Sequence, residues 1–141
     1  MNVLVLNGPN LNLLGEREPD VYGKENLEDL RVFLSQKFQD IQFEFYQSNI
    51  EGELINALHR ARLTQDGVVF NPGAFAHYAI ALRDAIKSIE IPVVEVHLSN
   101  IASREEFRRG SVVAPVCIGQ ISGFGFTSYL LGIEALRNTE K

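Results

Sequence analysis

Short apolar runs with the pattern of buried strands alternate with helical stretches five times along the chain, and this alternation constrains the fold more than any other feature. The strand-like runs are Asn2 to Asn7, Ile41 to Tyr46, Gly67 to Asn71, Pro92 to Leu98 and a less sharp one within Val116 to Ser122. Near-continuous apolar runs are typical of parallel strands that are covered on both faces. We therefore predict a doubly wound α/β fold with right-handed crossovers, a three-layer α/β/α sandwich around a five-stranded parallel sheet.

The helical stretches lie between these runs and after the last of them. They are Glu25 to Phe38, the residues after a capping-box pattern at Ser48 and Glu51, about His77 to Ile89, a short helix with Phe107 and Arg108, and a last helix with Tyr129, Leu130, Ile133 and Leu136 on its apolar face. Ser103 with Glu106 has the spacing of a cap for the short helix. The flavodoxin-like strand order 2-1-3-4-5 is the natural choice, although the sequence alone does not fix it. In such a sheet, ligands bind beyond the carboxyl ends of the strands, at the switch between strands one and three.

The composition is that of an ordinary globular protein and excludes several classes of partner. The 141 residues fit one domain, 1–141. Thirteen Lys and Arg against 18 Asp and Glu give a net charge of -5 without a long basic stripe. Nucleic acid and anionic membranes are therefore poor partners. No apolar run approaches the roughly 20 residues of a membrane span, and the chain opens on a strand pattern instead of a secretory signal.

Cysteine and histidine usage is sparse. Cys117 is the only cysteine, so no internal disulfide can form. The three histidines lack zinc-like spacing, and His59 falls in the second helix, where a structural role is expected. The simplest expectation is a cytoplasmic protein without a metal.

The segment from Asn7 to Gly23 has no strand or helix period and is rich in glycine, proline and asparagine. Loops of more than about a dozen residues within compact domains are usually functional or disordered. This loop contains Arg17 and Tyr22, whose side chains suit proton chemistry. A tyrosine in a loop is most often a packing residue; the alternative is a general base, which the charge of Arg17 would assist.

Polar side chains gather at the predicted ligand-binding edge of the sheet. Asn10 follows the first strand, Asn71 closes the third, and Glu95 and His97 lie near the end of the fourth. Glu95 and His97 are two residues apart on a strand and so share a face. They are either a buried pair that satisfies its own hydrogen bonds or a histidine poised to pass a proton. Their position at this edge favours proton transfer.

Two turns at the same edge suit an anionic group such as a carboxylate. Asn71 leads through a Pro-Gly turn into the helix that His77 is expected to begin, and the positive end of that helix would face the crevice. Leu98 and Ser99 offer a similar turn after the fourth strand. Each turn alone is compatible with an ordinary connection. Their convergence at one edge favours a binding pocket.

Two arginines on the predicted short helix lie beside this edge. Arg104 and Arg108 are four residues apart and so share a face. They are either solvated side chains or a pair of guanidinium groups that grip hydroxyl or carboxylate oxygens.

Several motifs together resemble the type II 3-dehydroquinate dehydratases of the shikimate pathway. The segments that carry the resemblance are NGPNLNLLGEREPDVYG from Asn7, QSNIEGELI from Gln47, NPGA from Asn71 with the following His77, ALRDA from Ala81, PVVEVHLSN from Pro92 and REEFRRGS from Arg104. They follow the family's order over nearly the whole chain. This makes the match far more specific than any single pattern.

The resemblance implies a hydro-lyase, a single catalytic domain that eliminates water from 3-dehydroquinate in the anti sense, through an enolate and without a metal, cofactor or Schiff base. Tyr22 would be the base that removes the proton beside the ketone, and Arg17 would favour its ionised form. Asn10 would hold the water that stabilises the enolate oxygen. His97 would protonate the leaving hydroxyl, and Glu95 would keep it oriented and charged.

The resemblance also implies substrate contacts and an assembly. The residues it assigns to the substrate are Asn71 with the backbone of Leu98 and Ser99 for the carboxylate, His77 and Arg108 for ring hydroxyls, and Arg104 once the loop closes. The family assembles as trimers packed into a dodecamer, and Asp84 matches the acidic residue that reaches a neighbour's site. The resemblance leaves open whether the enzyme serves aromatic amino-acid biosynthesis or quinate breakdown.

The chain departs from the family's pattern beside His77. Many relatives have threonine on both sides of this histidine and serine next, where this chain has Ala76, Tyr78 and Ala79. We expect the cap of the third helix and the recognition of ring hydroxyls to differ here.

A rival hypothesis is a non-catalytic module on the same fold that holds a flavin phosphate or receives a phosphoryl group. A flavin site would need a Ser/Thr-rich phosphate loop after the first strand. A phosphoryl acceptor would need an aspartate at the end of the third strand. The chain has asparagines at both places, Asn10 and Asn71.

Overall fold

The computed structural model describes residues 1–139 and contains one five-stranded parallel sheet in the order β2-β1-β3-β4-β5. The strands are β1 (Asn2–Asn7), β2 (Gln42–Gln47), β3 (Gly67–Asn71), β4 (Val93–His97) and β5 (Gly119–Ser122). Both the strand order and the parallel arrangement confirm the flavodoxin-like prediction. The fifth strand occupies the end of the range in which it was expected.

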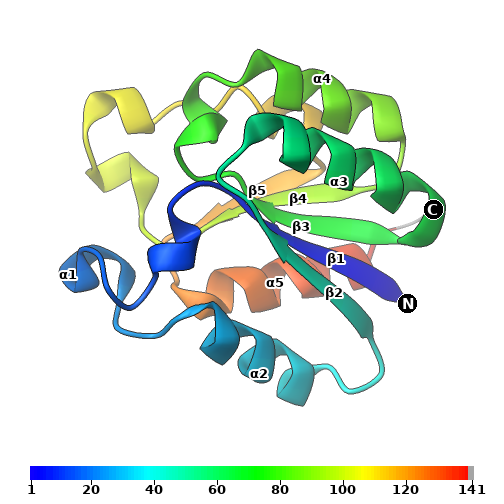
Figure 1. Cartoon of the computed structure of the whole chain (residues 1–141), viewed down its shortest axis with the longest axis horizontal. Coiled ribbons are helices and arrows are strands. Elements are labelled where there is room, and N and C mark those ends of the chain that lie inside the picture. Colours follow the sequence, from blue (N-terminus) through cyan, green and yellow to red (C-terminus); the bar gives the residue numbers. More distant parts are fainter. Residues whose placement is uncertain (140–141) are drawn as a thin grey trace.

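Helices cover both faces of the sheet. Figure 1 shows α3 (Glu51–Thr64) and α4 (Ile80–Ile89) over one face, and α2 (Leu27–Lys37) and α5 (Phe126–Arg137) over the other. Successive strand residues point to opposite faces, so each strand supplies both apolar layers. Leu4, Leu6 and Phe70 pack toward α3 and α4, whereas Val3 and Val5 pack toward α2 and α5. The three-layer sandwich is thus confirmed.

One glycine sets how closely α5 approaches the sheet. A Cβ atom built on Gly132 would lie 3.2 Å from a methyl of Val96 and 3.3 Å from a methyl of Val69. These separations are tighter than ordinary side-chain contacts, so a hydrogen atom is the only substituent that fits without a shift. Gly132 therefore lets the helix lie directly on β3 and β4.

Most of the short elements gather at the carboxyl edge of the sheet. They are the single turn α1 (Pro19–Tyr22) and the 3-10 turns η1 (Leu11–Leu13), η2 (Gly73–His77), η3 (Ile101–Ser103) and η4 (Glu106–Arg108). The remaining 3-10 turn, η5 (Ala114–Val116), lies just before β5 and near Pro92, toward the amino ends of the strands. Figure 1 shows α1 and the segment near residues 101–108 on the side where the strands end. The segment Asn7 to Gly23 thus contains local helical turns that its sequence did not predict. Pro19 at the first position of α1 explains one of them, because its fixed φ suits a helix start.

The helix expected from His77 starts later than predicted. His77 ends η2, Tyr78 has φ -152° and ψ -5°, and α4 begins at Ile80. The residue before it, Ala79, has no side chain that caps the helix. Ile80, its first residue, is 57% exposed, whereas Leu82, Ala85, Ile86 and Ile89 of α4 are buried. The lack of a side-chain cap is in line with the hydroxyl groups that this chain lacks beside His77, and the expectation that His77 begins the helix is wrong.

The capping box predicted at Ser48 and Glu51 is also wrong in detail. The Ser48 hydroxyl accepts from the Ile50 amide at 2.9 Å and donates to Glu53, so it does not pair with Glu51. A reciprocal capping box instead joins Asn26 and Asp29, which is why α2 starts after Glu25. Local hydroxyl and carboxylate patterns offer several equivalent partners, and tertiary packing selects among them.

The predicted short helix is two separate turns. Asn100 caps η3 by accepting from the Ala102 amide at 3.2 Å, whereas the Ser103 hydroxyl donates to the Asn100 carbonyl. Arg104 ends η3 and Arg108 belongs to η4. The argument that they share one helical face is therefore wrong, although both side chains reach the same pocket.

Candidate active site

A pocket of about 100 Å³ lies at the carboxyl edge of the sheet. Its lining residues are Asn10, Arg17, Tyr22, Asn71, His77, His97, Leu98, Ser99, Arg104 and Arg108, together with Pro9, Leu11, Gly73, Ala74 and Ile101. The structure thus brings together ten of the twelve residues expected from the sequence; Glu95 and Asp84 are the other two. Three segments of the chain, those that follow β1, β3 and β4, meet here because parallel strands end at one edge of the sheet.

Glu95 lies behind the pocket and is fully buried. Its Oε2 atom lies 2.7 Å from His97 Nε2, and the two side chains share a face of β4 as expected. The pair is both buried and at the ligand-binding edge, so the two interpretations of its sequence pattern do not exclude each other. Glu95 orients the imidazole and fixes which of its nitrogens faces the pocket.

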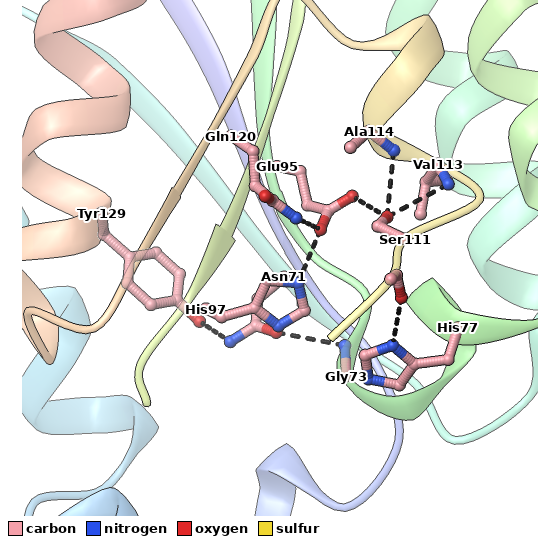
Figure 2. A network of polar contacts seen from close by, with 11 residues as sticks. Asn71, Gly73, His77, Glu95, His97, Ser111, Val113, Ala114, Gln120 and Tyr129 are labelled. Carbon is pink, nitrogen blue, oxygen red and sulfur yellow. Dashed lines mark hydrogen bonds and ion pairs between the residues drawn. The ribbon is translucent and has the colours of Figure 1, made fainter. Parts of the chain in front are cut away.

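Two further side chains donate to the same carboxylate, as Figure 2 shows. The Ser111 hydroxyl donates to Glu95 Oε1 at 2.7 Å, and the Gln120 amide donates to Oε2 at 2.6 Å. Burial opposes ionisation of Glu95, but the hydrogen bonds from His97, Ser111 and Gln120, with the charge of His97, hold its pKa below the usual value. The carboxylate is therefore an anion in the core.

Sequence reasoning missed both of these donors. Gln120 is the residue opposite Glu95 in the β4–β5 register, so a known register would have identified it. Ser111 follows the turn after η4, and its hydroxyl also accepts from the amides of Val113 and Ala114. Nothing in the local sequence pattern indicates that this serine faces Glu95.

Replacing Ser111 with alanine should make the protein less stable at neutral pH by about 2 kcal/mol, the typical contribution of a hydrogen bond to a charged group. The folded-state pKa of Glu95 is depressed, so its ionisation stabilises the fold above the unfolded-state pKa, and this contribution is lost as the pH falls through the folded value. Without the Ser111 donor, the folded pKa rises. In Ser111→Ala, the stability that ionised Glu95 contributes should therefore begin to fall at a higher pH than in wild type.

The measurement is the free energy of unfolding by urea, between pH 7 and about pH 3. The difference between wild type and Ser111→Ala should shrink toward acid pH, because a neutral carboxyl group depends less on the donor. Ser111→Thr retains the hydroxyl and serves as the control. A difference that is the same at every pH would mean that Ser111 stabilises only the turn around Val113 and Ala114.

Tyr22 lies between two guanidinium groups. Arg104 Nη1 donates to the phenol oxygen at 2.6 Å, and the Arg104 and Arg17 guanidinium carbons lie 5.1 Å and 4.9 Å from the ring centroid. Arg17 itself pairs with Glu18 at 2.8 Å. The sequence indicated Arg17 as the charged neighbour of Tyr22. The structure adds Arg104 as the group that touches the oxygen.

Asn71, His77 and His97 line the same pocket. His77 Nδ1 lies 2.7 Å from the Gly110 carbonyl oxygen, so this nitrogen carries a hydrogen and Nε2 remains for the pocket. The rings of His77 and His97 are nearly parallel, with their centroids 6.3 Å apart. The Asn71 amide oxygen accepts from the Gly73 amide at 3.1 Å, and its nitrogen donates to Tyr129 at 2.9 Å (Figure 2). Asn71 is therefore held on two sides.

Asn10 and Arg108 occupy the rim. Asn10 adopts a left-handed conformation with φ 69°, and its backbone N–H donates to Asn49 Oδ1 at 2.9 Å. Arg108 donates to Glu105. Asp84 lies exposed on α4 and does not line the pocket of its own chain.

Within residues 1–139, no group of three or more His, Cys, Asp or Glu side chains has the arrangement of a metal site. The same residues include no helix with the length and apolar character needed to cross a membrane.

Comparisons with known proteins identify the family of the chain. The model of the family described as dehydroquinase class II matches residues 1–137. The chain is 58% identical to a 3-dehydroquinate dehydratase of Clostridium acetobutylicum, over 98% of this chain and 97% of that protein. It is 62% identical to one of Bacillus pumilus, over 94% of this chain and 92% of the relative.

Solved structures give the same result. The crystal structure of the type II dehydroquinase from Butyrivibrio crossotus superposes with a TM-score of 0.95 at 47% identity, covering 98% of each chain. A family match across nearly the whole sequence, with the same fold, leaves one conclusion: the chain belongs to the class II dehydroquinase family.

Proposed function

We propose that the protein is a 3-dehydroquinate dehydratase, a hydro-lyase of the shikimate pathway of aromatic amino-acid biosynthesis. It eliminates water from 3-dehydroquinate in the anti sense and forms 3-dehydroshikimate through an enolate. One observation carries the mechanism: Tyr22 and His97 line the same small pocket, and buried Glu95 holds His97 from behind. A base on one side of the ring and an acid on the other are what an anti elimination requires.

Tyr22 removes the proton beside the ketone. For this step its oxygen must be a phenolate, and the positive charges of Arg104 and Arg17 stabilise negative charge at that oxygen. The electron pair of the broken C–H bond forms the enolate, whose oxygen is stabilised by a water molecule on Asn10.

His97 completes the reaction by protonating the leaving hydroxyl group. The enolate collapses, the C–O bond breaks, and the hydroxyl departs as water with the proton from His97. Glu95 keeps the imidazole in one orientation and stabilises its cationic form through the 2.7 Å contact. Tyr22 and His97 then exchange protons with solvent to restore the starting state.

The remaining polar groups bind the substrate. Asn71 and the backbone of Leu98 and Ser99 take the carboxylate, because backbone N–H groups and an amide N–H suit an anion. His77 and Arg108 take ring hydroxyls. Arg104 contributes to binding as well as to Tyr22.

The same proposal covers organisation and location. The chain acts as a single catalytic domain, 1–141, and assembles as trimers within a dodecamer, in which Asp84 reaches a neighbour's site. The exposed position of Asp84 on α4 supports this role, since it lies outside its own pocket. A cytoplasmic location is consistent with the family's biosynthetic role.

The test is to add 3-dehydroquinate to the purified protein and follow the absorbance of the conjugated enone product. We expect steady production of the enone, unchanged after treatment with EDTA. Heat-inactivated protein is the control for spontaneous elimination. Absence of the enone from folded protein would contradict the proposed function, and loss of activity with EDTA would contradict the metal-free mechanism.

A further inference from the structure

We propose that Tyr129, a buried tyrosine of α5, is a positioning residue that fixes the amide of Asn71 in the orientation needed to bind a carboxylate. The inference rests on the proposed function, because it assigns the substrate's carboxylate to Asn71. Tyr129 does not line the pocket, and it would act only through Asn71.

Tyr129 joins the ends of two neighbouring strands. Asn7 and Asn71 are register partners at the carboxyl ends of β1 and β3, where the order of the sheet reverses. Both are 3% exposed, and Tyr129 is fully buried. The Tyr129 hydroxyl lies 2.6 Å from Asn7 Oδ1 and 2.9 Å from Asn71 Nδ2. The side chain thus reaches from the helix layer to the point where the ligand pocket begins (Figure 2).

These hydrogen bonds can run in one direction only. The Gly73 amide donates to Asn71 at 3.1 Å, and because a backbone N–H can only donate, the accepting atom is Oδ1. Asn71 Nδ2 therefore faces Tyr129 and donates to its oxygen. The phenol hydrogen is then free to go to Asn7 Oδ1. Burial raises the pKa of Tyr129, so the phenol keeps the hydrogen that this last bond needs.

The direction of this chain decides what Asn71 offers to a ligand. An amide nitrogen has two hydrogens, and only one is used by Tyr129. Among the hydrogen bonds of residues 1–139, none uses the second. Asn71 therefore presents a donor to the pocket. A rotated amide would present an oxygen, which repels a carboxylate.

Removing the Tyr129 hydroxyl would remove one of the two hydrogen bonds that hold the Asn71 side chain. Phenylalanine fills nearly the same volume, so the apolar contacts of the ring remain. Asn71 Nδ2 would lose its acceptor and Asn7 Oδ1 its donor. The Gly73 N–H alone then holds the Asn71 amide, so the orientation that offers a donor to an anion is less firmly fixed.

The first experiment measures steady-state kinetics of Tyr129→Phe with 3-dehydroquinate. We expect KM to rise about tenfold, the effect of about one hydrogen bond, with kcat changed less than about twofold. Ile133→Val, one turn further along α5 and equally buried, is the control for general loss of packing. It should leave KM unchanged. A fall in kcat with constant KM would overturn the inference.

The second experiment measures binding calorimetrically with shikimate and with its methyl ester, which lacks the charge. Tyr129→Phe should weaken shikimate binding about tenfold and ester binding less than about twofold. In an Asn71→Ala background, Tyr129→Phe should have no further effect on shikimate. Equal losses for both ligands, or an undiminished effect without Asn71, would show a purely structural role and overturn the inference.

Should Tyr129→Phe fail to fold, Asn7→Ala provides the same test. Without Asn7 Oδ1, the phenol hydrogen can turn toward Asn71 Nδ2 and oppose the donor orientation that the Gly73 N–H favours, so the selective loss of shikimate binding should persist. Equal binding of shikimate by Asn7→Ala and wild type would then overturn the inference. A wild-type protein that forms no enone contradicts the proposed function, whereas an active wild type with unchanged KM in Tyr129→Phe contradicts only the role of Tyr129.

Discussion

Replacing Tyr22 with phenylalanine should lower kcat by about three to four orders of magnitude, the upper range for loss of a general base. The substitution removes one oxygen, and this oxygen is the atom that Arg104 contacts at 2.6 Å. The aromatic ring remains between the guanidinium groups of Arg104 and Arg17, so the shape of the pocket should persist. KM should therefore change little. The measurement is the rate of enone formation at saturating 3-dehydroquinate.

Tyr46→Phe is a matched control. Tyr46 lies on β2 with the Arg60 guanidinium 5.7 Å from its ring centroid, so it also has a cationic neighbour, but it does not line the pocket. Loss of the Tyr46 hydroxyl should leave the rate of enone formation within about twofold of wild type. If Tyr22→Phe retained a tenth or more of the wild-type kcat, Tyr22 would not be the base.

Replacing His97 should lower kcat by about two to four orders of magnitude, because the hydroxyl group would then leave without a proton donor. His97→Ala also removes a partner from buried Glu95, and breaking a buried charged pair in this way typically costs about 3–5 kcal/mol. Ser111 and Gln120 remain bonded to the carboxylate and offset part of this cost. Activity and stability should both fall.

His97→Gln separates the two effects. Its amide can still donate to Glu95, so the free energy of unfolding should lie closer to wild type than that of His97→Ala. An amide cannot supply a proton at neutral pH, so kcat should remain as low as in the alanine variant. Near-normal turnover by either variant, measured by enone formation, would exclude His97 as the acid.

The sequence predicted the strands and the sheet edge that position the site, because these depend on patterns of neighbouring residues. Apolar runs identify the strands, and parallel strands must end at one edge, which brought Asn71 and His97 together without knowledge of any contact. The pairing of Glu95 with His97 followed from the period of a strand. Each of these inferences needs only neighbours along the chain.

The contacts that the sequence could not predict join distant segments. Arg104 and Tyr22 are 82 residues apart, and Tyr129 and Asn7 are 122 apart. Their partners depend on the path of the loops and on how deeply α5 sits on the sheet. The predicted start of α4 was wrong for a related reason, since a 3-10 turn and an α-helix both suit the residues around His77.

We expect Gly132 to affect ligand binding although it does not line the pocket. It lies one helical turn after Tyr129, and its missing side chain sets the gap between α5 and the strands. A helix displaced by even a few tenths of an ångström would stretch the 2.6 Å and 2.9 Å bonds of the Tyr129 hydroxyl. A position without a side chain thus acts as the spacer that sets the position of the proposed carboxylate-binding group, which lies at the end of β3 on the same face of the sheet.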